Sequence, residues 1–219
     1  MTRALRRVVA AALTLLSVAA APSTPADEPA AAFAAAQAEF ERGLAGESGA
    51  NDRAHERFRR LVEQEPGNPL YVAYYGSTFA ILGKGAWAPW NKMKLTERGL
   101  GLLEKAVSLL APEQDRATVR GVPVSEEVRL TAASTFLAVP GLFHRTEAAR
   151  LVLADALASP AFAATPPPVQ ARLLAQAALL AQRDEKPKEE ADALRRALAL
   201  APDGAVAARA RARLKEIAP

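Results

Sequence analysis

The sequence predicts an all-α fold, and three observations support that class. Alanine, the residue with the highest helix propensity, is abundant along the whole chain of 219 residues. Apolar residues recur at the spacing of amphipathic helices. Few segments alternate apolar and polar residues with β-branched enrichment, so no strand is predicted. Half of the residues are hydrophobic, which is enough for one domain with a sizeable core or for a short repeat array.

The N-terminus has the pattern of a secretory signal peptide. Arg3, Arg6 and Arg7 form a charged region, and an apolar run follows at residues 8–21. That run is too short for an ordinary membrane span. An N-terminal helix or an uncleaved anchor is the alternative interpretation. The residues around the arginine pair fit a twin-arginine signal poorly, so we expect the general secretory route.

Small residues after the apolar run predict cleavage after Ala20 or Ala26. We therefore expect residues 1–26 to be a signal peptide and linker, and residues 27–219 to form a helical repeat domain. The mature protein is expected to be periplasmic or secreted, with no stable transmembrane anchor.

Removal of the predicted signal peptide changes the net charge of the protein. The full chain has 28 Lys and Arg against 24 Asp and Glu, a net charge of +4. Removing the three leader arginines leaves 25 against 24, a net charge of +1. The mature protein then has no global excess of charge to favour nucleic acid or an acidic membrane surface. The absence of cysteine excludes disulfides and thiolate chemistry.

The first two predicted helices form a hairpin. Residues 29–44 make the first, because Pro29 suits the first turn of a helix. Its inner face holds Phe33, Ala36, Phe40 and Gly43 or Leu44. Glycines in residues 46–49 break it, and Asn51 or Asp52 can cap the next helix, which ends before Pro66.

The stretch of residues 54–83 places two amphipathic helices around a short break. The first has one apolar face, made of Ala54, Phe58, Leu61 and Val62. The second has another, made of Val72, Tyr75, Gly76, Phe79 and Gly83. Asn68 suits the turn, and Pro69 can begin the second helix. We expect Gly76 to lie where two helices approach too closely for a side chain.

The remaining helices are placed by apolar spacing and by proline and glycine breaks. They are expected at residues 92–110, 125–139, 147–158, 169–182, around 190–197, and 205–217. Residues 113–124 are polar and broken by proline, with room for one helical turn. The last helix carries arginines and a lysine beside its apolar face, as a solvating cap helix does.

Several positions resemble the tetratricopeptide repeat. The match in the central stretch lies at Ala54, Phe58, Leu61 and Pro66, and continues at Gly76 and Phe79 of the following helix. Leu61 replaces the usual alanine, and Val72 the usual tryptophan. The spacing recurs at Glu190, Leu194, Ala197 and Pro202. Pro66 and Pro202 are 136 residues apart, four times the family period of about 34. The resemblance implies an α-solenoid of about four antiparallel hairpins with a C-terminal capping helix.

Candidates for catalysis are few. His144 and Glu147 are neighbours, but no third ligand lies at metal-site spacing. The pairs Glu126-Glu127 and Glu189-Glu190 are interpreted as solvated helix starts, because neighbouring helical residues point in different directions. No nucleophile elbow or phosphate-binding loop is present in the sequence. We expect no enzyme activity, no cofactor and no metal.

Two groups of residues are candidates for binding a partner. The segment of residues 83–94 holds both tryptophans of the chain, and its candidates are Trp87, Trp90, Lys92 and Lys94. The competing interpretation, which we favour here, is that the indoles cover the core between helices. Ligands of tetratricopeptide proteins commonly occupy the concave groove lined by first helices. The resemblance therefore implies Tyr71, Tyr74, Tyr75 and Ser77 as groove candidates.

We expect a non-catalytic module of the cell envelope that binds a protein or peptide and serves as a scaffold or accessory factor. The alternative is a periplasmic small-ligand carrier or an envelope enzyme that uses the Trp/Tyr region as a pocket. Tryptophans lining a deep closed cavity favour the carrier, whereas an open concave face lined by Tyr71 and Tyr74 favours the interaction module. Partner, pathway and oligomeric state stay open.

Overall fold

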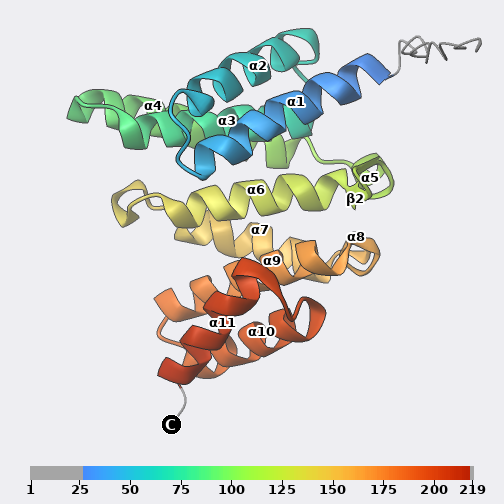
Figure 1. Cartoon of the computed structure of the whole chain (residues 1–219), viewed down its shortest axis with the longest axis vertical. Helices are drawn as coiled ribbons and strands as arrows, with labels where there is room; N and C mark the ends of the chain where they lie inside the picture. Colours follow the sequence, from blue (N-terminus) through green and yellow to red (C-terminus); the bar gives the residue numbers. More distant parts are fainter. Residues whose placement is uncertain (1–26, 218–219) are drawn as a thin grey trace, which may run out of the picture.

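The computed structural model describes residues 27–217, and this part of the chain is almost entirely helical (Figure 1). It contains eleven α-helices and one 3-10 turn, η1 (Gly141–Phe143). The helices are α1 (Asp27–Leu44), α2 (Ala50–Gln64), α3 (Pro69–Gly85), α4 (Pro89–Ser108), α5 (Pro112–Arg116), α6 (Val124–Ala138), α7 (Thr146–Ala158), α8 (Pro160–Ala164), α9 (Pro167–Arg183), α10 (Pro187–Leu200) and α11 (Gly204–Glu216). The all-α class is thereby confirmed. The predicted signal peptide and its cleavage sites lie outside the described residues.

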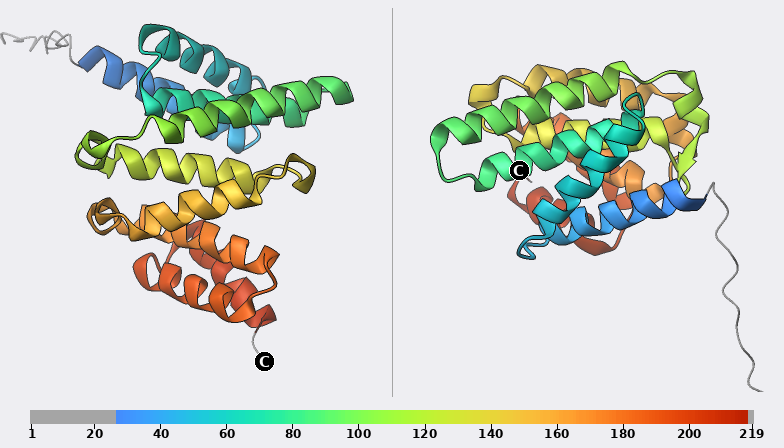
Figure 2. Two further views of the ribbon diagram at one scale, coloured as in Figure 1. Left: turned by 180° about the vertical axis from the view of Figure 1, so that it is seen from behind. Right: turned by 90° about the horizontal axis from the view of Figure 1, so that it is seen from above.

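Neighbouring helices pack as hairpins that follow one another along the long axis of the molecule (Figures 1 and 2). The hairpins are α1–α2, α3–α4, α6–α7 and α9–α10, and α11 packs on the last of them. One hydrophobic core runs from Phe33 in α1 to Leu180 in α9. Two smaller clusters join α9 to α10, and one of them extends to α11. None of the helices between residues 27 and 217 is long and apolar enough to cross a membrane.

The turn between α2 and α3 has the chemistry that the sequence predicts. Asn68 caps α3: its Oδ1 accepts hydrogen bonds from the backbone N–H groups of Leu70 (3.1 Å) and Tyr71 (3.4 Å). Pro69 occupies the first position of the helix, where an N–H is not needed. Most other helix boundaries fall within a few residues of their predicted positions. Helix α4, for example, begins at Pro89, three residues before the predicted Lys92. The short helix α8 was not predicted.

A short antiparallel hairpin between α5 and α6 corrects the prediction that the chain has no strand. Strand β1 (Thr118–Val119) pairs with β2 (Val122–Pro123). The turn residues Arg120 and Gly121 both have positive φ, 52° and 77°. A two-residue turn with positive φ at both positions matches the twist of paired strands. Two-residue strands are too short to show a period of two in the sequence, so these strands leave no recognisable pattern. The predicted helical turn in this region is α5.

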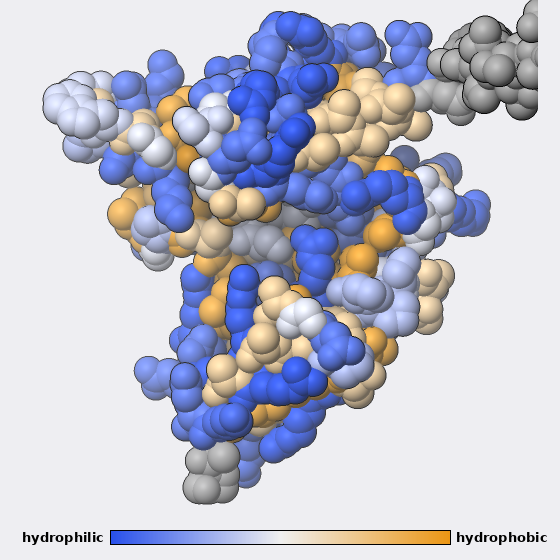
Figure 3. Space-filling view, viewed as in Figure 1, coloured by the Kyte–Doolittle hydropathy of each residue, from blue (hydrophilic) through white to orange (hydrophobic). Residues whose placement is uncertain are grey.

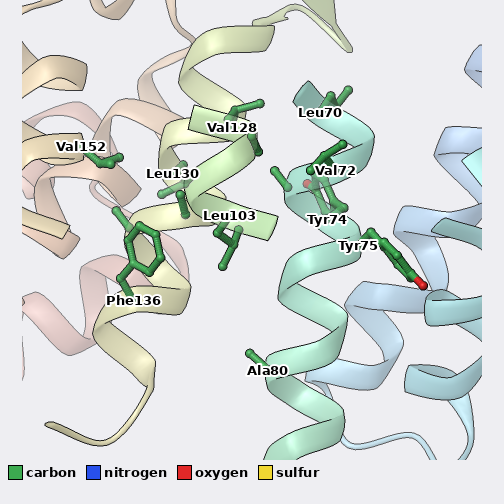
Figure 4. Close-up of a cluster of buried hydrophobic side chains, with 14 of the residues drawn as sticks. Leu70, Val72, Tyr74, Tyr75, Ala80, Leu103, Val128, Leu130, Phe136 and Val152 are labelled. Carbon is green, nitrogen blue, oxygen red and sulfur yellow. The ribbon is translucent and has the colours of Figure 1, made fainter. Parts of the chain in front are cut away.

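Helix α3 is the most enclosed element of the described chain. Nearly all of its residues from Pro69 to Ala80 are buried, because α2, α4 and α6 pack around it. Figure 4 shows part of this core, with side chains of α3 (Val72, Tyr74), α4 (Leu103) and α6 (Val128) between the helices. A β-carbon on Gly76 would lie 2.8 Å from the carbonyl oxygen of Gly99 in α4. The predicted close approach at Gly76 is confirmed.

Candidate contact surfaces at the two ends of helix α3

The α3–α4 turn exposes the two tryptophans to solvent. Trp87 is 92% exposed, Trp90 69% and Met93 46%. Trp87 lies in the turn, and Trp90 and Met93 lie one helical turn apart at the start of α4. The interpretation that the indoles cover the core is therefore wrong. The small side chain of Ala88 is the buried anchor of this turn, so the larger groups on either side of it point outward.

Three lysines surround these apolar groups. Lys84, Lys92 and Lys94 are all exposed, and none of them forms an ion pair with another described residue. We call the set formed by Trp87, Trp90, Met93, Lys84, Lys92 and Lys94 the α3–α4 tip. The tip stands out beyond the neighbouring hairpins at the left edge of Figure 1. The predicted candidates Trp87, Trp90, Lys92 and Lys94 are thus all exposed to solvent.

The four candidate residues in helix α3 differ from those of the tip in their exposure. Tyr71, Tyr74, Tyr75 and Ser77 are all buried. Tyr74 stacks on Phe58 with ring centroids 5.0 Å apart, and the hydroxyl of Ser77 shares a hydrogen bond of 2.9 Å with that of Thr135 in α6. Helices pack on every side of α3, so these residues do not form an open concave face. Residues 27–217 also form no deep cavity around the tryptophans, because both are exposed.

Tyr71 nevertheless borders an open groove at the N-terminal end of α3. The groove has a volume of about 610 Å³ and lies between α1, the α2–α3 turn, α5 and the β-hairpin. Its apolar walls come from Phe33, Leu70, Val119 and Val124, and its polar lining includes Glu65, Asn68, Gln114 and Thr118. Burial raises the pKa of the Tyr71 phenol, with a smaller contribution from Glu65. The groove and the α3–α4 tip thus lie at opposite ends of α3.

The edge of strand β1 lines this groove. Val119 pairs with Val122 beside the two-residue turn, and Thr118 lies opposite Pro123, which has no N–H to donate. Antiparallel strands alternate between hydrogen-bonded and non-hydrogen-bonded pairs, so the N–H and C=O of Thr118 point away from β2. The sheet has two strands, and the outer edge of β1 has no partner strand within residues 27–217.

The predicted solvated pair Glu126-Glu127 is buried, which corrects the sequence-based interpretation. Glu127 accepts a hydrogen bond from the hydroxyl of Tyr74, which in turn accepts one from Gln37 Nε2 at 2.9 Å. Arg120 of the β-hairpin turn lies 3.9 Å from the Glu127 carboxylate. Burial, followed by the charge of Glu127, raises the pKa of the Tyr74 phenol. These contacts join α1, α3 and α6 in one polar network inside the core.

Glu126 lies in a second buried polar group. Its Oε1 accepts a hydrogen bond of 2.7 Å from Arg129 Nη1, and Arg129 also lies 3.7 Å from Asp115 of α5. Its Oε2 has no hydrogen-bond partner in the described part of the chain. Burial is the main cause that raises the pKa of Glu126, and the charge of Arg129 opposes it. Desolvation of the carboxylate therefore outweighs the ion pair.

We expect Glu126→Gln to raise the free energy of unfolding at about pH 7, because the neutral amide removes a buried charge. A carboxyl whose pKa is higher in the folded state than in the unfolded state stabilises the fold when it is protonated. That stabilisation is complete below its pKa in the unfolded state, and is lost as the pH rises through its pKa in the folded state. The advantage of the variant should therefore vanish at about pH 4, near the ordinary pKa of glutamate. Urea unfolding at several pH values measures it. A variant less stable at neutral pH would show that the ion pair with Arg129 dominates.

Glu190 is buried as well, whereas Glu189 is exposed as predicted. Glu190 accepts hydrogen bonds from Arg213 Nε (2.6 Å) and Nη2 (3.2 Å) of helix α11. The last helix is therefore joined to α10 by an ion pair in addition to apolar packing through Ala210, Leu214 and Ile217.

The histidines show no catalytic arrangement in the described residues. His144 is exposed at the end of η1, and Glu147 is bound to Arg150 at 3.0 Å. His55 shares a hydrogen bond of 2.9 Å with Thr78, and burial lowers its pKa. No group of three His, Asp or Glu side chains between residues 27 and 217 is placed to hold a metal ion.

Comparison with known proteins gave no match: no protein-family model, no curated protein and no solved structure is similar to the chain. The functional assignment therefore rests on the chain's own surfaces.

Proposed function

We propose that this protein is a non-catalytic, protein- or peptide-binding module of the cell envelope, with the architecture of a tetratricopeptide-like α-solenoid. Consecutive helical hairpins packed in chain order support the architecture, and the N-terminal sequence pattern supports an exported compartment. Its role is that of a scaffold or accessory factor, because a rigid stack of helices presents separate contact surfaces in a constant arrangement.

The free edge of strand β1 beside the groove is the observation that carries this proposal. An unpaired strand edge is a template for an added strand, and proteins normally shield it by covering or charging it. Here Thr118 and Val119 of this strand line a hollow with apolar walls and a polar rim. An extended peptide can pair with the backbone of Thr118 while its side chains contact Val119 and Val124, the half-buried apolar residues of the lining. A backbone-pairing edge favours a peptide over a compact small ligand, so the carrier is the second candidate.

A photo-crosslinking amino acid at Gln114, which lines the groove, tests the proposal in the native host. We expect a covalent adduct with one protein partner. Thr118→Pro removes the outward N–H and should reduce the adduct roughly fivefold, since one backbone hydrogen bond contributes about 1 kcal/mol. The backbone before this position suits a proline, because Ala117 has φ −65° and ψ 137°.

The matched control is Thr118→Val, which keeps the N–H and should keep the adduct. Circular dichroism and the melting temperature of both variants establish that they are folded. An adduct that is equally strong in Thr118→Pro would contradict pairing with β1, and the lack of any protein adduct at Gln114 would contradict the groove as the binding site.

A further inference from the structure

The exposed apolar groups of the α3–α4 tip have no explanation in the fold. Tryptophan is among the most buried residue types on average, yet both tryptophans of this chain are on the surface. Trp87, Trp90 and Met93 are within seven residues of one another and lie at one end of a hairpin. An exposed apolar group of this size, surrounded by polar residues, indicates an interaction site.

The charge around the tip is of one sign. Residues 66–96 contain three lysines and no aspartate or glutamate. The next acidic residue along the chain, Glu97, is held by Arg145 at 3.4 Å. Next to the tip, Glu47 of the α1–α2 connection and Asp52 of α2 line a hollow that also reaches Gly85. Glu47 accepts a hydrogen bond of 2.6 Å from Arg53, whereas Asp52 forms no ion pair with another described residue. The charged residues of the tip itself are therefore all positive, although the mature chain is close to neutral.

The tip is presented by a rigid support. A β-carbon on Gly83 would lie 2.5 Å from the hydroxyl oxygen of Thr96, and one on Gly99 would lie 2.5 Å from the carbonyl oxygen of Gly76. Helices α3 and α4 are thus in close contact from Gly76 and Gly99 to Gly83 and Thr96, in the last turn of α3 before Trp87. A surface that is already ordered loses little conformational entropy when it binds.

The shape of the tip favours a flat, soft surface over a protein pocket. In Figures 1 and 2 the α3–α4 end extends away from the body, and the space-filling view of Figure 3 shows it as a protrusion. The α6–α7 connection, which carries the exposed side chain of Leu142, lies on the same side in these views. Indole rings prefer the boundary between hydrocarbon and water, and lysines beside them are attracted by anionic headgroups.

We infer that the α3–α4 tip docks the protein on an anionic lipid bilayer, with Trp87, Trp90 and Met93 in the headgroup region and Lys84, Lys92 and Lys94 on the phosphates. The contact is peripheral, since it involves one helical turn and its flanking residues. Apolar insertion and positive charge act together here, as stable membrane association requires. This surface is separate from the groove, so the inference goes beyond the proposed peptide binding.

Intrinsic fluorescence tests this docking directly, because the only two tryptophans of the chain are in the tip. The purified protein is mixed with vesicles of phosphatidylcholine alone, and with vesicles in which one lipid in four is phosphatidylglycerol. We expect the emission to move to shorter wavelength with the anionic vesicles only. Phosphatidylcholine carrying a nitroxide on its acyl chain near the headgroup, added to the same mixture, should quench that emission.

Variants distinguish the effect of the tip lysines from the effect of the net charge of the protein. Lys84→Gln, Lys92→Gln and Lys94→Gln, combined, should weaken vesicle binding by roughly fivefold for each lysine at low salt. The matched control is Lys105→Gln, Lys188→Gln and Lys215→Gln, combined, which changes the net charge equally at exposed positions away from the tip and should bind like the wild type. Trp87→Ala with Trp90→Ala should reduce co-sedimentation roughly tenfold or more.

An unchanged emission with anionic vesicles would overturn the inference, and so would equal binding by the tip triple variant and its charge-matched control. A protein adduct formed by a photo-crosslinker at position 87, without any vesicle binding, would assign the tip to a protein partner instead. None of these results affects the adduct at Gln114, so failure of the membrane contact and failure of the peptide groove are distinguishable.

Discussion

Gly76→Leu is expected to destabilise the protein by roughly 3 kcal/mol or more, which lowers the melting temperature by about 6–12 °C for a chain of this size. A β-carbon at this position would lie 2.8 Å from the carbonyl oxygen of Gly99, 3.0 Å from Cβ of Leu102 and 3.1 Å from Cγ of Leu103. The first of these neighbours is backbone and cannot change rotamer. Leucine adds three more carbons to the same space, so α3 and α4 must separate.

A pair of glycines in α4 isolates the effect of close packing from the effect of helix propensity. A β-carbon on Gly99 would meet the carbonyl oxygen of Gly76 at 2.5 Å and the backbone nitrogen of Ala80 at 2.9 Å, whereas one on Gly101 would meet nothing within 4 Å. Alanine favours a helix over glycine by about 0.5–1 kcal/mol. Gly101→Ala should therefore stabilise the protein by about that amount, and Gly99→Ala should destabilise it.

Thermal and urea unfolding of these variants measure the difference. Opposite signs for Gly99→Ala and Gly101→Ala are the expected outcome, because the two substitutions are identical in chemistry and two residues apart in one helix. If both stabilised the protein equally, or if Gly76→Leu melted with the wild type, α3 and α4 would not be in the backbone contact described above.

The sequence carried enough information for the helices and for this contact. The cap at Asn68, the proline at position 69 and the apolar spacing of Phe58 and Leu61 are local signals, and a helix depends mainly on local signals. Gly76 was predictable for the same reason: a glycine in the middle of an apolar helix face is unfavourable unless a neighbour needs the space.

The candidate sites were predicted less well, because exposure depends on partners distant in sequence. Tyr74 and Ser77 were implied as groove residues, but α6, about fifty residues further along, covers them. Glu126 and Glu127 have the pattern of a solvated helix start, and their burial follows from the packing of α5, α8 and the β-hairpin around that end of α6. One feature of the sequence was consistent with the exposure of Trp87. Residues 66–96 contain no aspartate or glutamate and have lysines near their C-terminal end.

Tyr74→Phe is expected to destabilise the protein by about 2–4 kcal/mol, the usual range for removing a partner from a buried charge. Tyr74 and Glu127 are both buried, and the phenol is the hydrogen-bond donor to this carboxylate. Its removal also takes away the acceptor of the hydrogen bond from Gln37 Nε2. The Oε1 atom of the same amide already has no partner among the described residues. The guanidinium of Arg120, 3.9 Å away, does not replace the lost hydrogen bond.

Tyr75→Phe is the matched control, since it removes the same atom from the next residue of the same helix. Tyr75 is also buried, but its hydroxyl forms no hydrogen bond with a side chain in residues 27–217, so its loss should change stability by about 0.5 kcal/mol or less. A second background, Glu127→Gln, keeps the acceptor and removes the charge, and the effect of Tyr74→Phe should shrink there. Unfolding in urea of all four variants, three single and one double, gives the coupling energy. Equal losses for Tyr74→Phe and Tyr75→Phe would mean that ring packing, rather than the hydrogen bond to Glu127, holds α3 against α6 at this point.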